Sequence, residues 1–325
     1  MSLSSAINTA QSSLSNTSTQ TSVVSRNISN ASNPDYNRRS AILSTTWYGA
    51  SVATTQRSQN SALLREGLTG IGQASSQKTL LTGLERLQSI YGGNDYESSP
   101  ASLLADFRDT LSVYGTKPSE STLAESAVAD AMQLAAGLRT ASASVQSTRL
   151  AADQDIARDV SKLNGLLAEY ETANNAIIRG TQSGADINNE LDQRDKLLKQ
   201  ISGIVSVSTV TRTGNDMAIY TTDGLTLFEK VPRPVTFVAS GGFSAALNGN
   251  AIFVDGAPLA AGQGAVTTGS GSLQAHLQIR DEYAPMMQNQ LDEIARGLVA
   301  VFAETDQSAT PTLPDMPGLF TWSGG

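Results

Sequence analysis

The sequence contains no cysteine among its 325 residues and only one histidine, His276. The absence of cysteine excludes disulfide bonds, thiol catalysis and cysteine-ligated zinc. We interpret His276 as a structural or exposed side chain, because no acid pair is spaced to complete a metal site with it. The serine nucleophile elbow, the P-loop and the dinucleotide glycine fingerprint are also missing. The sequence therefore predicts a protein that is not an enzyme and that has no cofactor.

Aromatic residues make up only 5% of the chain and hydrophobic residues 39%, so we expect thin aliphatic cores of the kind found in helical bundles. A basic excess is lacking as well, since the net charge is −8, which argues against nucleic acid or an anionic membrane as partner. The sequence has neither a run of about 18 apolar residues nor a basic leader followed by an apolar segment. We therefore expect no membrane span and no conventional cleavable signal peptide.

The longest helical pattern runs from about Ser119 to Gly180 without a break. A helix of this length is roughly 90 Å long at about 1.5 Å per residue. It cannot bury an apolar stripe alone and needs partner helices beside it. We therefore predict a mainly α protein with an inserted β domain (α+β), built as an elongated antiparallel helical bundle around one long rod helix. The stripe follows a 4-3 spacing, which places its members on one helical face: Ile156, Val160, Leu163, Leu167, Tyr170, Asn174 and Ile177.

Residues 1–31 carry a weaker stripe with the same spacing in a sequence rich in Ser, Thr and Asn. Its apolar members include Leu3, Ile7, Leu14 and Ile28. Because Ser and Thr are mediocre helix formers, we expect this helix to become ordered only against another helix. A disordered polar tail is the alternative interpretation.

Shorter helices are predicted on either side of the long one. Asn27, Asn30 and Pro34 end the N-terminal helix, because Asn tolerates a left-handed backbone and Pro cannot continue a helix. Residues 38–57 are extended in character, and a helix follows from near Asn60. Ser99 with a proline after it predicts the start of the next helix.

A change of period marks the second half of the chain. Asp186 is the expected N-cap of a helix that ends at Gly203. From residue 204 to about 271 the period is two, and Asp-Gly pairs at 223–224 and 255–256 indicate hairpin turns. Helical spacing returns at Ser272, with a kink expected at Pro285.

Five parts of the chain are expected from these patterns. The last part is rich in Pro, Gly and Thr and ends without a capping element, so we expect the chain to be the front of a longer protein. In order, the parts are an N-terminal helix and extended linker (1–57), a helical bundle (58–204), an inserted small β domain (205–271), the returning helix (272–305) and the start of a second excursion (306–325).

Two arginine residues occupy stripe positions that are otherwise apolar. Arg194 is flanked by Asp192 and Asp195, and Arg280 lies in the returning helix. A buried arginine must pair or reach water, because an unpaired buried charge is costly. We expect both arginines to set helix register through carboxylates on neighbouring helices; the alternative is that both reach water at the rim of the bundle. Asn174 fits the same register role, as a lone polar residue in a helical seam can.

An enzyme hidden in the β insertion, such as a cell-wall hydrolase, is the remote alternative. It would need convergent acids in a cleft, and the segment offers Asp216, Asp223, Glu229 and Asp255. Two of these stand in Asp-Gly turns, where turn geometry already explains them.

Three segments of the chain resemble a known protein family. Leu191–Asp195, followed by Leu197 and Leu198, resembles the L-D-Q-R-D-x-L signature of the flagellar hook-associated protein 1 family (FlgK), the hook–filament junction proteins. Residues 272–302 are similar to the returning helix of that family. The N-terminal segment resembles the leader shared by rod, hook and junction proteins, with matches at Leu3, Ala6, Asn8, Leu14, Asn27–Ala31 and Pro34–Arg38.

The resemblance implies a structural role in the bacterial flagellum, with a flagellin-like or hook/rod axial protein as the alternative. It implies a secreted, extracellular subunit that passes the flagellar type III export apparatus with an export chaperone and then self-assembles into a ring. The implied partners are other copies of the chain, hook protein and adjacent junction or filament proteins, but no nucleic acid and no membrane. In that scheme residues 1–30 pack into the tubular core. Assembly is expected to depend on Leu3, Ile7, Leu14, Asn27, Ile28 and Asn30.

Overall fold

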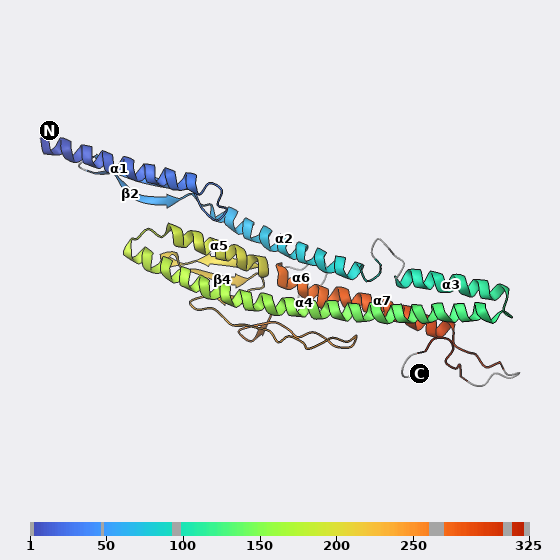
Figure 1. Cartoon of the computed structure of the whole chain (residues 1–325). Helices are drawn as coiled ribbons and strands as arrows, with labels where there is room; N and C mark the ends of the chain where they lie inside the picture. The colour runs from blue at the N-terminus through green and yellow to red at the C-terminus, as the bar shows by residue number, and fades with distance from the viewer. Residues whose placement is uncertain (1–2, 47–48, 93–98, 260–269, 308–313, 322–325) are drawn as a thin grey trace.

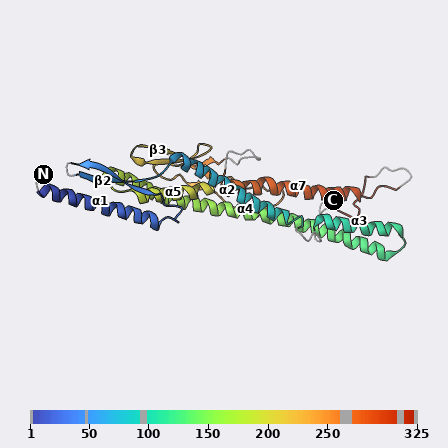
Figure 2. The same ribbon diagram turned by 90° about the horizontal axis from the view of Figure 1, so that it is seen from above.

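The computed structural model describes residues 3–46, 49–92, 99–259, 270–307 and 314–321. The molecule is an elongated set of rods with small sheets along one part, as both views show (Figures 1 and 2). The predicted mainly α architecture with a β insertion is thereby confirmed. In the described part of the chain, no helix combines the length and the hydropathy that crossing a bilayer would require.

The long helix α4 (Ser121–Ser183) organises the rest. Its 63 residues correspond to a rod of roughly 95 Å at about 1.5 Å per residue. Figure 1 shows that the other helices of the bundle run opposite to it. They are α2 (Ser61–Gln88), α3 (Pro100–Thr116), α5 (Asn188–Ile204), α6 (Ser272–Gln278) and α7 (Ala284–Val301).

Local chemistry explains most of the helix boundaries. Asn60 caps α2, with its side chain accepting from the backbone N–H groups of the first turn, and Ser99 caps α3 in the same way. Gly184 closes α4 in the left-handed conformation at φ 70°. The predicted N-cap Asp186 is displaced by one residue, because the cap position of α5 is Ile187. The Asp186 carboxylate instead accepts the backbone N–H of Asn188 at 3.0 Å.

The N-terminal segment forms helix α1 (Leu3–Ser29) and an antiparallel hairpin, β1 (Arg39–Thr46) and β2 (Gly49–Arg57). The stretch 38–57, expected to be extended, is therefore a hairpin whose two strands hydrogen-bond to each other. Helix α1 lies against this hairpin at one end of the molecule (Figure 1).

Two three-stranded antiparallel sheets make up the β insertion, in the orders β3-β4-β5 and β6-β7-β8. Tyr170 of α4 packs edge-on against Phe228 and donates its hydroxyl to the Met217 carbonyl at 3.0 Å. The insertion thus shares a hydrophobic core with α4 and α5, while the five-part division of the chain stays a prediction. The strands are β3 (Val207–Thr211), β4 (Met217–Thr221), β5 (Thr226–Phe228), β6 (Val235–Thr236), β7 (Phe253–Val254) and β8 (Ala257–Pro258).

The returning helix is interrupted where the sequence predicts a kink. A π-helical turn, Ile279–Tyr283, separates α6 from α7, and Pro285 stands in the first turn of α7. Beyond α7, the described residues 314–321 fold back, so that the ring of Phe320 packs edge-on against Phe107 and Phe302 at centroid distances of 5.6 and 5.4 Å. The expected second excursion from residue 306 stays a prediction, since residues 308–313 and 322–325 lie outside the described part.

Candidate assembly site

The N-terminal arm, which we define as residues 3–57, is joined to the bundle by one arginine on each strand of its hairpin. Arg39 and Arg57 are cross-strand partners, and only 4% and 9% of their surfaces are exposed. Two buried guanidinium groups this close need carboxylate partners. Helix α5 supplies them, because Asp192 and Asp195 lie three residues apart on one helical face.

The resulting contacts are short and shared. Arg39 Nη2 lies 2.9 Å from Asp192 Oδ2, and Arg57 Nη1 lies 2.9 Å from Asp192 Oδ1. Arg57 Nη2 lies 2.7 Å from Asp195 Oδ2. Burial raises the pKa of the Asp195 carboxyl above its ordinary value, and the Arg57 guanidinium opposes this shift. We call these four residues the arginine–aspartate cluster; it fixes the arm to α5.

Amide side chains complete the cluster. Asn37 Nδ2 donates to Asp192 Oδ1 at 3.0 Å, and Gln59 Nε2 donates to Asp195 Oδ2 at 2.8 Å. Asn189 Oδ1 accepts from Arg39 Nη2 at 2.8 Å. The carboxylates of α5 are thus held by side chains that come before, within and after the hairpin.

Asn27 connects α1 to the hairpin. Its Nδ2 donates to the Arg39 carbonyl at 2.8 Å, and its Oδ1 accepts from the Tyr36 hydroxyl at 2.8 Å and the Arg39 N–H at 2.9 Å. Asn30 likewise donates to the Arg26 carbonyl at 3.0 Å. These bonds shape the turn after α1, and the assembly role expected of both residues stays a prediction.

The two faces of α1 differ sharply. One face is turned to the hairpin: Val23 is buried, and Asn16 Oδ1 accepts the Val52 N–H at 2.9 Å. On the other face, the apolar stripe is exposed at 80% for Leu3, 57% for Ile7 and 73% for Leu14. Ile28 is exposed at 71%. A large exposed apolar surface is typical of an interaction site, so the stripe is a candidate for one.

Arg194 lies on the opposite face of α5 from the cluster and is 4% exposed. Its Nη1 donates to Asn174 Oδ1 at 3.2 Å and to the Asn215 carbonyl at 2.6 Å. The expected carboxylate partner is therefore wrong for Arg194, because these acceptors are an amide and a peptide carbonyl. Burial lowers the pKa of Arg194. Asn174 Oδ1 also accepts the Met217 N–H at 3.1 Å, so this polar group joins α4, α5 and β4.

Arg280 does find a carboxylate on a neighbouring helix. Its Nη1 lies 2.6 Å from Asp153 Oδ1 of α4, and its Nη2 lies 2.7 Å from Asp281. Burial alone would lower the pKa of Arg280. Hydrogen bonds and charge interactions with Asp281 and Asp153 outweigh that effect, so the pKa is raised. Arg149 of α4 donates its Nε–H to the Arg280 carbonyl at 3.0 Å. That carbonyl needs an outside donor, since the π-helical register would pair it with residue 285, a proline.

Three acids of the β insertion contact arginine side chains. Glu229 and Asp255 pair with two different arginines, Arg212 and Arg233. Asp216 accepts from Asn174 at 2.7 Å. Among the described residues, no cluster of three or more His, Asp or Glu could hold a metal ion. Asp216 also lies 3.9 Å from Arg212, the partner of Glu229, so these acids are held by arginine and amide side chains.

His276 is largely buried beside α4. Its Nε2 lies 3.9 Å from Asp159, and burial lowers the pKa of the imidazole. The expectation of a structural histidine agrees with this position beside Asp159.

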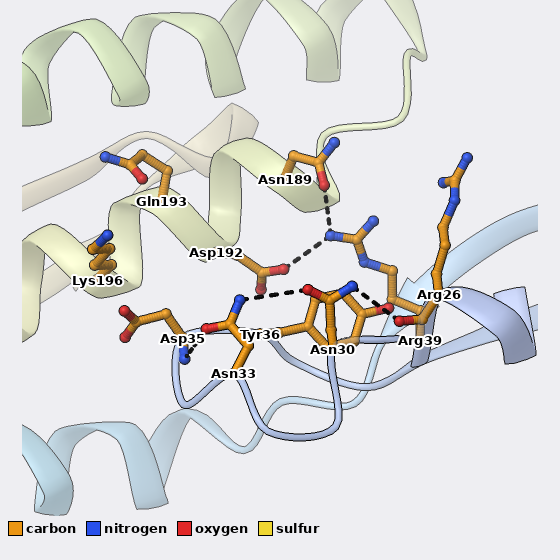
Figure 3. A pocket seen from close by; sticks show the side chains of 10 residues that line it. All are labelled: Arg26, Asn30, Asn33, Asp35, Tyr36, Arg39, Asn189, Asp192, Gln193 and Lys196. Carbon is orange, nitrogen blue, oxygen red and sulfur yellow. Dashed lines mark hydrogen bonds and ion pairs between the residues drawn. The ribbon is translucent and has the colours of Figure 1, made fainter. Parts of the chain in front are cut away.

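A polar hollow of about 410 Å³ lies between the turn after α1 and the first turns of α5. Figure 3 shows Asn189, Asp192, Gln193 and Lys196 of α5 on one side of it and the turn with Tyr36 on the other. We call it the arm cavity. It belongs to the contact that fixes the arm.

Sequence reasoning missed Arg39, Arg57, Arg149 and Asp153. Arg149 and Asp153 follow Val145 at spacings of four on the rod, so the stripe itself could have revealed them. The two hairpin arginines had a weaker signal, since only a hairpin register brings the ends of the extended stretch together.

Two comparisons with known proteins gave a match. A family model described as the flagellar hook-associated protein FlgK helical domain matches residues 84–312. Among solved structures, the flagellar hook junction protein FlgK from Burkholderia pseudomallei is similar, with a TM-score of 0.59 and 19% sequence identity. The match covers 75% of this chain and 44% of that one, so the chain spans less than half of the solved protein. A search of curated proteins gave no match.

Proposed function

Because the chain belongs to the FlgK family of flagellar hook-associated proteins, we propose that it is a structural subunit joining the flagellar hook to the filament. The observation that carries this proposal is the apolar stripe of α1, which is turned away from the rest of the chain. Leu3 and Leu14 are exposed at 80% and 73% although an apolar side chain gains free energy when it leaves water. The stripe is therefore available for a partner helix.

The rest of the arm supports an assembly role by fixing where this stripe points. Asn16 and Asn27 attach α1 to the hairpin, and the arginine–aspartate cluster attaches the hairpin to α5. An element held in its bound orientation loses less conformational freedom on association. Repeated contacts between one face and a different face of the next copy generate rings or helical tubes.

The finer parts of the role are proposals of the same kind. The partners would be further copies of the chain, the hook protein and adjacent junction or filament proteins. Passage through the flagellar type III export apparatus with a chaperone would deliver the subunit to the outside of the cell. A chain without cysteine suits export in an unfolded state, because no disulfide can form before passage.

We also propose that the chain catalyses no reaction, in keeping with the structural character of its family. Asp255 and Glu229 of the β insertion are each occupied by an arginine, Arg233 and Arg212, as structural carboxylates often are. This arrangement supports a scaffold and gives no reason to favour the hydrolase alternative.

The experiment is binding of the purified chain to isolated hooks, followed by sedimentation. Burial of one leucine side chain contributes about 2 kcal/mol, so Leu14→Gln should weaken attachment by at least roughly tenfold. Ser13→Gln introduces the same side chain beside the stripe and should leave attachment unchanged. Equal attachment of both variants and the wild type would refute an assembly role for the stripe.

A further inference from the structure

The arm cavity has an excess of positive charge. Five cationic side chains line it or pair with its lining, against three carboxylates when Asp195, the second carboxylate bound by Arg57, is counted with Asp35 and Asp192. The carboxylates are already occupied, since Asp192 and Asp195 belong to the arginine–aspartate cluster and Asp35 lies 3.1 Å from Lys199. Two positive charges therefore remain without a counterion.

These two charges are Arg26, from the last turn of α1, and Lys196 of α5. Neither side chain has an ion pair or hydrogen bond among the described residues, although both line the cavity. Figure 3 shows them on opposite sides of it, with no dashed line reaching either side chain. A group bound between them would be in contact with both the arm and the bundle.

The remaining polar groups of the cavity are mostly amides with donors to spare. Asn189 uses its Oδ1 for Arg39, which leaves its Nδ2 group available, and Gln193 has no partner for its amide in the described structure. Cations and N–H donors together select an oxyanion over a neutral or cationic group.

We propose that the arm cavity binds a carboxylate of a neighbouring subunit in the assembled flagellar axis, held between Arg26 and Lys196 with amide donors from α5. The inference rests on the proposed function, because a neighbouring subunit supplies the carboxylate. The volume of about 410 Å³ exceeds that of a single carboxylate, so the side chain that carries it can enter too. Such a contact would stabilise the orientation of the arm only once the neighbour is in place.

Binding of the anion can be tested without assembly. The full chain would be titrated with sodium acetate at constant ionic strength, with the side-chain amide signals of Asn189 and Gln193 followed by nuclear magnetic resonance. We expect saturable shifts in the wild type and roughly tenfold weaker binding in the double variant Arg26→Gln, Lys196→Gln. Lys162→Gln removes an exposed cation elsewhere and should leave binding unchanged. Shifts that do not saturate, or that are equal in the double variant, would overturn the proposal.

Two further experiments identify the source of the anion. Sodium sulfate in place of acetate should bind no more tightly; saturation by sulfate alone would show a site for a free oxyanion and overturn the carboxylate. In hook sedimentation, the double variant should attach less than Lys162→Gln does, and equal attachment would exclude a neighbouring subunit as the source. Leu14→Gln should lose attachment yet keep acetate binding, so failure of the assembly role and failure of this proposal give different results.

Discussion

Arg39 and Arg57 face each other across the N-terminal hairpin, and both guanidinium groups end on the same carboxylate of α5. A pair of like charges at 4% and 9% exposure would be unstable without that carboxylate. The hairpin therefore has one favourable position on the bundle, and α1 takes its direction from it.

Replacing Asp192 with Asn should release the arm while leaving the bundle folded. The variant leaves Arg39 without a carboxylate and Arg57 with Asp195 as its remaining carboxylate, and breaking a buried ion pair from one side costs about 3–5 kcal/mol. Hydrogen exchange should accelerate in β1 and β2 and stay slow in the buried part of α4.

Asp109→Asn provides the matched control. Asp109 pairs with Arg108 at 2.7 Å, but its side chain is 67% exposed, so the loss should be within about 1 kcal/mol. Equal protection of the hairpin in both variants would mean that the cluster does not hold the arm.

Asn174→Ala should destabilise the half of the bundle that contains the β insertion. The substitution removes the acceptor of the Arg194 Nη1–H and of the Met217 N–H, both in a buried region. Leaving buried donors without partners costs about 1–3 kcal/mol each. Urea unfolding should show a lower midpoint than for Thr172→Ala, an exposed change on the same helix. A midpoint equal to that of Thr172→Ala would argue against a register role for Asn174.

The π-helical turn gives a prediction that couples two positions. Arg149→Gln should destabilise the bundle, because the Arg280 carbonyl loses its donor and the Ser244 and Leu247 carbonyls lose theirs. Pro285→Ala restores a backbone N–H near the Arg280 carbonyl, so the cost of Arg149→Gln should be lower by about 1 kcal/mol in that background.

A double-mutant cycle by chemical denaturation measures this coupling. Additive effects would show that Arg149 acts through the loop carbonyls alone. The cycle has its own internal control, since any general effect of Pro285→Ala on the unfolded chain appears in both backgrounds and cancels.

The sequence predicted most helices because their stripes are long and regular, as in α4, where Ile156 and Leu167 are fully buried at their expected positions. It failed where partners depend on tertiary register. Asp192 and Asp195 flank Arg194 in the sequence, but a helix turns by about 100° per residue and separates them from it. Their true partners, Arg39 and Arg57, lie 135 or more residues away, and only the hairpin brings them together.

Mild acid should weaken the bundle through His276. Burial lowers the pKa of its imidazole in the folded chain, whereas the unfolded chain titrates at the ordinary value of 6.5. The unfolded state therefore binds the proton first as the pH falls. The resulting stability is fully present well above pH 6.5 and is lost between 6.5 and the lower folded value.

The free energy of unfolding, measured by urea denaturation from about pH 7.5 to 5.5, should fall by at most about 1.4 kcal/mol per pH unit from this group. His276→Gln should flatten the slope even if it lowers the overall stability, because glutamine does not titrate. Asp195 acts in the opposite sense, since its raised pKa favours the folded state as the carboxyl takes up a proton. Its contribution is the same in both proteins, so the difference between the two slopes isolates His276. An unchanged slope in the variant would place the pH dependence elsewhere.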